Sequence, residues 1–205
     1  MNEKLQLVAL TGGIATGKST VARLFEDLYP SMVLFDADSV VRSLYANEEV
    51  IREIVDYFGH RSILQGGELD RAYLRHRAFA FPADRQFLEG VFHPRVREEC
   101  LALLEISAKR AVSRLFVADI PLLFESGFDF GQSANLMVAT SQATQVARLK
   151  KRNAWDDETV NGVICSQMPI SAKMARADVV FWNEGPLDVL RRQCRRFIHS
   201  LGIGQ

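Results

Sequence analysis

The sequence predicts a three-layer α/β fold, in which a five-stranded parallel sheet carries helices on both faces. Three observations lead to this fold class. Short apolar segments alternate with longer segments of helical periodicity. The first apolar segment, residues 5–10, is apolar along nearly its whole length, as strands buried on both faces of a parallel sheet are. A glycine-rich turn then joins this segment directly to a helical pattern.

Five segments are predicted to be strands and six to be helices. The second and third strands share one feature, because each runs from apolar residues into an acid, Asp36 or Asp119. The predicted strands are residues 5–10, 32–36, 115–120, 135–140 and 179–182. The predicted helices are residues 20–28, 47–58, 69–79, 94–109, 141–153 and 186–201.

The spacing of these segments predicts an insertion and a lid. Residues 37–114 separate the second strand from the third, which is too many for one crossover helix. We therefore expect a core of residues 1–38, 113–147 and 178–205, with a helical insertion of residues 39–112. The polar segment of residues 148–177 suits a mobile lid, and we expect a flexible turn at residues 155–158.

The composition is that of an ordinary globular protein and excludes several classes. The 25 Lys and Arg residues balance 25 Asp and Glu residues, so no overall positive charge favours nucleic acid, and any anion site must be local. No apolar run approaches the ~20 residues of a membrane helix, and we expect no leader, hence a cytoplasmic protein. Cys100, Cys165 and Cys194 form no CxxC pair, and we expect them to be reduced, small buried residues.

Residues 12–19, GGIATGKS, fit the phosphate-loop pattern G-x-x-x-x-G-K-[ST]. Glycines let successive backbone N–H groups turn toward a phosphate, and the start of the following helix adds unpaired donors. Lys18 would reach the outer phosphates, and the Ser19 hydroxyl would hold Mg²⁺. The residues predicted to contact ATP are Gly13, Ile14, Ala15, Thr16, Gly17, Lys18, Ser19 and Thr20. The alternative, a plain glycine turn, does not account for all four fixed positions.

Other residues decide what kind of nucleotide enzyme this is. The sequence has no NKxD guanine-reading motif and no glycine-rich transporter signature. Small-molecule kinases instead place an acid at the end of the second strand, and Asp36-Ala37-Asp38 stands there. One of the two carboxylates would take the proton from an attacking hydroxyl. Asp38 could equally cap the helix that runs on through Val40 and Val41.

At this point the sequence resembles the dephospho-coenzyme A kinase family along nearly its whole length. Residues 10–20, LTGGIATGKST, are similar to the family's opening, and DAD at residues 36–38 matches its acidic motif. Further matches in family order are LDR at residues 69–71, FHP at 92–94 and PLLFE at 121–125. Later matches are Gln145, Arg148, Arg152, Gln167, Lys173, Asp178, Asn183 and Gly185.

The resemblance implies transfer of the γ-phosphoryl group of ATP to the ribose 3′-hydroxyl of dephospho-coenzyme A. It makes Asp38 the general base, with Asp36 assisting Mg²⁺ or orienting the hydroxyl. It places the acceptor site in the insertion, where Arg71 and Arg75 lie four residues apart and could reach the acceptor's phosphates. A solvated arginine face is the alternative for this pair.

The same resemblance assigns the remaining site residues. Arg148 and Arg152 would neutralise charge from the lid, and Asn183 and Gly185 would border the adenine ring. Asp119, before Pro121, looks like the magnesium-organising acid of phosphate-loop enzymes in general, and it would share Mg²⁺ with Ser19. Thr11 and His93 are further candidates for substrate contact, although the His93-Pro94 pair could instead start a helix. The implied ligands are ATP, Mg²⁺ and dephospho-coenzyme A, without a nucleic acid, a membrane or an obligate protein partner.

Two positions depart from the family pattern. Ala15 stands where the family has glycine, and its methyl group requires a negative φ. Val163 stands where an arginine is common, four residues before Gln167. Two other functions stay open from the residues: a related kinase with a different small-molecule acceptor, and a nucleotide-dependent regulator in which ATP reshapes the insertion.

Overall fold

The computed structural model describes residues 5–110 and 113–203, which form two compact units. The larger unit comprises Met1–Phe35 and Leu103–Gln205, and the smaller comprises Asp36–Ala102. Within the described residues no helix is long and apolar enough to span a bilayer.

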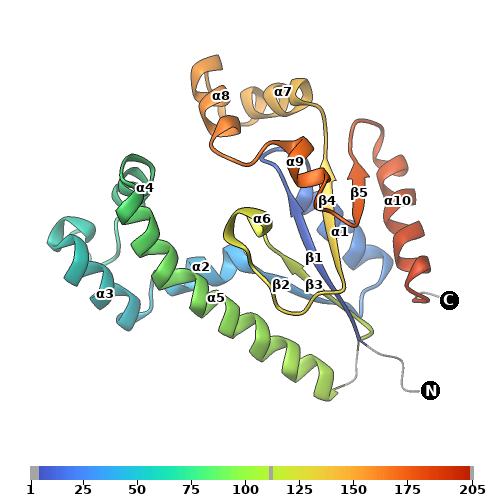
Figure 1. The fold of residues 1–205 in the computed structure, drawn as a ribbon, viewed down its shortest axis with the longest axis horizontal. Helices are drawn as coiled ribbons and strands as arrows, with labels where there is room; N and C mark the ends of the chain where they lie inside the picture. The colour runs from blue at the N-terminus through green and yellow to red at the C-terminus, as the bar shows by residue number, and fades with distance from the viewer. Residues whose placement is uncertain (1–4, 111–112, 204–205) are drawn as a thin grey trace. The chain divides into compact units, whose positions relative to one another are not determined.

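A five-stranded parallel sheet, in the order β2-β3-β1-β4-β5, forms the centre of the larger unit (Figure 1). Its strands are β1 (Gln6–Gly12), β2 (Val33–Asp36), β3 (Leu115–Asp119), β4 (Ala134–Ala139) and β5 (Val179–Trp182). All five agree with the predicted strands to within two residues. The central strand β1 pairs with β3 and β4, with Leu10 opposite Asp119. Because the strands are parallel, their carboxyl ends and the loops that follow lie at one edge of the sheet.

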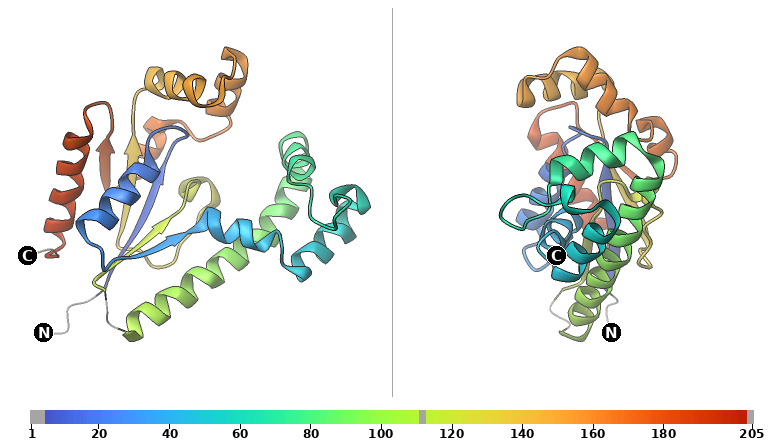
Figure 2. Two further views of the ribbon diagram at one scale, coloured as in Figure 1. Left: turned by 180° about the vertical axis from the view of Figure 1, so that it is seen from behind. Right: turned by 90° about the vertical axis from the view of Figure 1, so that its left-hand side faces the viewer.

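Two helices, α1 (Lys18–Leu28) and α10 (Leu187–Ser200), lie side by side on one face of this sheet (Figure 2, left). Phe25, Phe181 and Phe197 join them to β5, with ring centroids 5.8–5.9 Å apart. Burial of a side chain of this size stabilises a fold by about 1.5–3 kcal/mol. The cluster therefore fixes the helix that begins at the phosphate loop.

The lid segment contains more helix than its sequence indicates. The larger unit includes α6 (Leu123–Ser126), α7 (Gln142–Asn153), α8 (Asp157–Cys165) and α9 (Ile170–Met174). The expectation of a flexible turn at residues 155–158 is wrong, because α8 begins at Asp157. The Asp156 side chain caps α8 by accepting a hydrogen bond from the Thr159 N–H at 2.8 Å. Asp157 and Glu158 lie in the first turn of α8, where their negative charges interact favourably with the positive end of the helix dipole.

The smaller unit is helical. It contains α2 (Ala37–Leu44), α3 (Glu48–Phe58), the short 3-10 helix η1 (His60–Ser62), α4 (Arg71–Ala80) and the first part of α5 (Pro82–Arg110). The side chains of Asn47 and Asp70 cap α3 and α4. Tyr57 of α3 stacks on Phe87 of α5, with ring centroids 3.8 Å apart.

The helix α5 is continuous where the sequence predicts a helix over residues 94–109 only. His93 and Pro94 lie inside it, so the alternative in which this pair starts a helix is wrong. Proline lacks the N–H that a helix interior uses. The carbonyl that loses its usual donor is that of Gly90. The next carbonyl, that of Val91, accepts a side-chain hydrogen bond from Arg95 Nη1 at 2.8 Å. The helix continues past Ala102, where the smaller unit ends, whereas the expected insertion reaches residue 112.

Candidate active site

The glycine-rich turn after β1 folds as a tight loop that opens α1. Thr16 closes it, because its N–H and its hydroxyl both donate to the Gly13 carbonyl, at 3.3 and 2.8 Å. Gly17, the residue that precedes α1 as its N-cap, has a φ of 99°. A Cβ atom at Gly17 would lie 2.2 Å from Asn183 Nδ2. Both the backbone angle and the available space therefore require glycine at this position.

Ala15, at the apex of this loop, has a φ of 59°. The expectation of a negative φ is therefore wrong, because the alanine adopts the left-handed conformation that glycine would take. For an L-residue this conformation costs about 1–2 kcal/mol. Arg148 Nη1 donates to the Ala15 carbonyl at 3.1 Å, which helps to hold the strained peptide in place.

Lys18, the first residue of α1, extends to the end of β3. Its Nζ donates to Oδ1 of Asp119 in an ion pair whose side chains are only 16% and 10% exposed. Asp119 stands opposite Leu10 in the register of β3 and β1, so the sheet delivers this carboxylate to the base of the loop. The predicted phosphate-binding lysine and the predicted magnesium-organising acid thus meet directly.

The oxygen atoms near the start of α1 suit Mg²⁺. Ser19 is exposed, and Asp119 supplies a carboxylate. Residues 5–110 and 113–203 contain no cluster of three or more His, Cys, Asp or Glu side chains able to hold a metal by themselves. Mg²⁺ does not need one, because it is usually bound through one or two carboxylates together with waters and substrate phosphates. The donor set therefore fits this cation.

Arg148 of α7 connects the lid segment to the loop. Its Nη1 donates to the carbonyls of Ala15 and Thr16 at 3.1 Å, and its Nη2 donates to the Asn183 carbonyl at 2.9 Å. The Asn183 side chain in turn donates to the Thr16 carbonyl at 2.8 Å. Arg148 was predicted as a lid residue and Asn183 as a neighbour of adenine, and the two contact each other and the carboxyl half of the loop.

Two glutamines hold the other half of the loop, and neither was among the predicted site residues. Gln145 Nε2 donates to the Ile14 carbonyl at 2.6 Å, and the Ile14 N–H donates to Gln167 Oε1 at 3.0 Å. Their positions in the family pattern were the only signal for them in the sequence. The Gln167 side-chain oxygen is therefore the acceptor for one backbone N–H of the loop.

A buried ion pair attaches the lid segment to the core. Lys173 of α9 is fully buried, and its Nζ lies 2.7 Å from Oε1 of Glu125 on α6. The same Glu125 oxygen accepts from the Met168 N–H at 3.1 Å. Glu125 is the last residue of the PLLFE motif. Its carboxylate therefore holds residues 168–173 in place, directly after Gln167.

In the smaller unit, the two acids of the DAD motif differ in role. Asp36 is the cap of α2, because its Oδ1 accepts from the Ser39 N–H at 3.0 Å and Oδ2 lies 3.6 Å from Arg42 Nη2. Asp38 lies in the first turn of α2 and is exposed. The alternative in which Asp38 caps this helix is therefore wrong.

The remaining predicted residues occupy different settings. Arg71 and Arg75 are exposed on α4, and Arg71 lies over the Tyr45 ring at 4.7 Å. Burial raises the pKa of Tyr45, and both arginines oppose that shift. His93 is exposed on α5. Thr11 is fully buried, and its hydroxyl donates to the Pro121 carbonyl at 3.1 Å.

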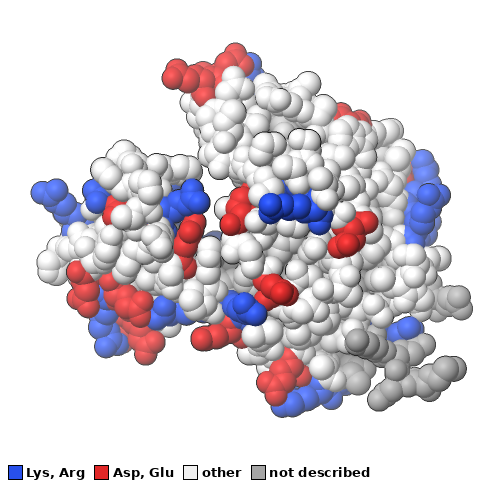
Figure 3. All heavy atoms as spheres, in the orientation of Figure 1, with Lys and Arg blue, Asp and Glu red and all other residues white. Residues whose placement is uncertain are grey.

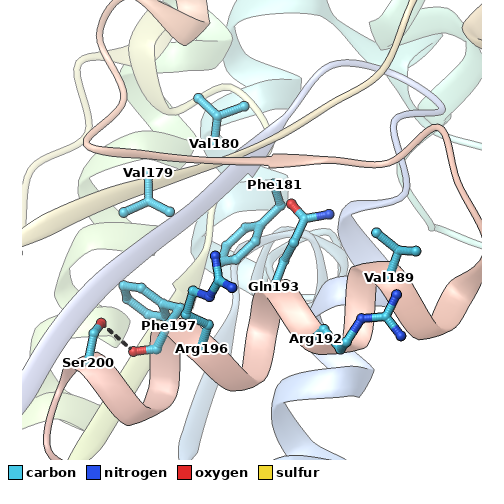
Figure 4. A pocket seen from close by; sticks show the side chains of 9 residues that line it. All are labelled: Val179, Val180, Phe181, Val189, Arg192, Gln193, Arg196, Phe197 and Ser200. Atoms are coloured by element: carbon cyan, nitrogen blue, oxygen red, sulfur yellow. Dashed lines mark hydrogen bonds between the residues drawn. The ribbon is translucent and has the colours of Figure 1, made fainter.

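The described residues of the larger unit line cavities at two places. One, of about 470 Å³, is lined by Gly13, Gln145 and Gln167 together with residues of α8 and α9. The other, of about 580 Å³, lies between β5 and α10 and is lined by none of the predicted site residues (Figure 4). On the face drawn in Figure 3, basic and acidic side chains are interspersed without an extended patch of either sign.

Residues 6–188 match the family described as dephospho-CoA kinase. The chain is 38% identical to a dephospho-CoA kinase of Shewanella oneidensis, over 95% of this chain and 91% of that protein. A crystal structure of a Thermus thermophilus protein superposes with a TM-score of 0.80, at 32% identity, covering 97% and 98% of the two chains. A dephospho-CoA kinase from Campylobacter jejuni superposes with a TM-score of 0.69, at 25% identity, covering 95% and 96%.

Proposed function

The chain belongs to the dephospho-CoA kinase family, and from this premise we propose how its residues carry out ATP-dependent phosphorylation of the ribose 3′-hydroxyl of dephospho-CoA. The observation that carries the proposal is the phosphate loop itself. Its lysine lies at the base of the loop, and Arg148 and Asn183 hold its carboxyl half. Catalysis in such a site comes from positioning and charge neutralisation.

In the proposed mechanism, the loop amides and Lys18 bind the phosphates of ATP. Lys18 would exchange its bond to Asp119 for the outer phosphates, and so would carry charge that develops during transfer. Arg148 would neutralise further charge from the lid of residues 148–177. Asn183 and Gly185, at the carboxyl end of β5, would border the adenine ring. Thr11 supports the loop through its bond to Pro121.

The Ser19 hydroxyl and the Asp119 carboxylate would hold Mg²⁺. When bound, the cation would neutralise phosphate charge and orient the transferring group. Release of Asp119 from Lys18 would make the carboxylate available as a ligand, so one exchange would prepare both groups for the nucleotide.

The acceptor would be bound by the helical insertion of residues 39–112. Asp38 would take the proton from the 3′-hydroxyl, because its carboxylate is exposed while Asp36 is engaged in capping α2. Arg71 and Arg75, one turn apart on α4, would bind the acceptor's phosphates. His93 of α5 would be a further contact to the acceptor.

The test is phosphorylation of a panel of acceptors by the purified chain with ATP and Mg²⁺. We expect ADP release that requires dephospho-CoA and a product heavier by one phosphoryl group on the 3′-hydroxyl, identified by mass spectrometry and ³¹P NMR. Nucleosides, nucleoside monophosphates and shikimate serve as competing acceptors. Preferential phosphorylation of one of these would replace the proposed acceptor. ATP binding without transfer to any of them would support the regulator instead.

A further inference from the structure

We propose that Glu184 is a positioning residue of the ATP site. Its carboxylate ties the loop after β5 to the start of α7, and so holds Arg148 and Asn183 against the phosphate loop. This inference rests on the proposed function, because it concerns how well that site binds and orients ATP. Glu184 lies between the two residues that were predicted to border adenine and was itself not predicted.

The Glu184 carboxylate accepts hydrogen bonds from three groups around the start of α7. Its Oε1 accepts from the Thr140 hydroxyl at 2.6 Å and from the Ser141 N–H. Its Oε2 accepts from the Thr144 hydroxyl at 2.7 Å. These bonds, led by the one from Thr140, lower the pKa of Glu184 to about 2. The carboxylate is therefore ionised throughout the pH range in which the reaction is assayed.

Capping of α7 does not explain this arrangement. The cap is already made within the helix, because Ser141 Oγ accepts from the Thr144 N–H at 3.2 Å. Glu184 binds instead from a loop 40 to 44 residues away in the chain. Its bonds thus fix two separate elements to each other. A negative charge at the start of a helix adds to this attraction.

The residue next to Glu184 transmits this constraint to the phosphate loop. The Asn183 carbonyl accepts from Arg148 Nη2 at 2.9 Å. It also lies 3.2 Å from the Thr140 hydroxyl, whose single hydrogen is donated mainly to the nearer Glu184 oxygen at 2.6 Å. The Asn183 side chain donates to the Thr16 carbonyl at 2.8 Å. A shift of this loop would therefore move the Asn183 carbonyl, which orients the Arg148 guanidinium. It would also move the Asn183 side-chain amide, which holds the Thr16 carbonyl.

The end of β5, where this loop begins, is held by α10. Gln193 accepts from the Trp182 N–H and donates to the Trp182 carbonyl, each at 3.0 Å. In Figure 4 the Gln193 side chain extends from α10 toward β5. Three consecutive residues are thus each held by a different element. Trp182 is held by α10, Asn183 by the phosphate loop and Glu184 by the start of α7. Of these three residues, only Glu184 makes its hydrogen bonds through a charged side chain.

The experiment compares Glu184→Ala and Glu184→Gln with the control Glu26→Ala, an exposed glutamate of α1. We expect Glu184→Ala to weaken ATP binding in calorimetry and to lower kcat/KM for ATP, each roughly 10- to 100-fold, with KM for dephospho-CoA nearly unchanged. Glu184→Gln should recover most of the loss, since it keeps an oxygen acceptor for Thr140 and Ser141 and its amide can donate to the Thr144 hydroxyl. Glu26→Ala should match the parent chain.

A double-mutant cycle with Arg148→Ala separates positioning from general destabilisation. If Glu184 acts in part through Arg148, the loss of kcat/KM for ATP in the double variant, expressed as a free energy, should be smaller than the sum of the two single losses. Additive losses, or ATP affinity of Glu184→Ala equal to that of the parent chain, would overturn the inference. If the parent chain binds ATP but does not phosphorylate dephospho-CoA, the proposed function fails, while the calorimetric comparison still decides the role of Glu184.

Discussion

The Asp36 carboxylate accepts a hydrogen bond from the Ser39 N–H at 3.0 Å and so caps α2, which leaves Asp38 exposed in the first turn of the same helix. The two acids of one short motif thus differ in setting, and we propose the chemical role for the exposed one. Capping engages an oxygen of Asp36 in a bond that the helix needs, whereas the exposed carboxylate of Asp38 is accessible to a substrate hydroxyl.

Asp38→Asn should lower kcat by ~10²–10⁴-fold with little change in ATP affinity, because the amide cannot accept the proton. Asp36→Ala should instead lower the free energy of unfolding by about 0.5–2 kcal/mol, and Asp36→Asn should lower it much less, because asparagine also caps helices. Steady-state kinetics and urea unfolding measure the two effects. Full turnover in Asp38→Asn would remove Asp38 from the mechanism.

Ala15→Gly should raise the free energy of unfolding by up to about 1 kcal/mol, because glycine adopts the φ of 59° without steric strain. Ala147→Gly, at an exposed site inside α7, is the matched control and should cost about 1 kcal/mol. Denaturant unfolding of both variants measures the difference. Equal destabilisation by the two substitutions would contradict the left-handed conformation of Ala15.

Glu125→Gln should destabilise the protein by about 3–5 kcal/mol, because it leaves the buried Lys173 ammonium without its counter-ion. Lys173→Met should cost less, since it removes the buried charge as well. The comparison is made by thermal and denaturant unfolding. If Lys173→Met proved the more damaging of the two, the buried charge would not be what Glu125 compensates.

The three cysteines should differ in reactivity. Burial raises the pKa of the Cys100 and Cys194 thiols to about 12, whereas Cys165 is exposed at the end of α8. Because the thiolate is the reactive form, a thiol reagent at pH 8 should label Cys165 rapidly and the other two only after unfolding. Cys165→Ser should abolish the rapid phase. This assignment corrects the expectation that all three cysteines are buried.

The strands and the phosphate loop were predictable because their signals are local. An apolar run, glycines at fixed spacing and a helical pattern lie within residues 5–28, and the carboxyl ends of parallel strands then bring Asp119 and Asn183 to the same edge. The start of α8 was missed because the acidic run at residues 156–158 resembles a turn, whereas the Asp156 side chain caps the helix there.

The side chains that hold the site were harder to predict, because their contacts are distant in sequence. Gln167 bonds to Ile14 across 153 residues, and Glu184 bonds to Thr140 across 44. Spacing along the chain indicates which residues share a helix face, but it does not give the distance between a loop and a side chain from another element. The φ of Ala15 is similarly set by tertiary contacts, including its bond from Arg148.

The central claim is that the loop of residues 12–19 binds a polyphosphate with Lys18 at its base. Calorimetric titration of the chain with a non-hydrolysable ATP analogue and Mg²⁺ tests it most directly, with Lys18→Ala as the comparison. We predict one binding site in the parent chain and a loss of at least about tenfold in affinity in Lys18→Ala, as expected when a charge-assisted phosphate contact is removed. Unchanged affinity in a folded Lys18→Ala protein would contradict the account.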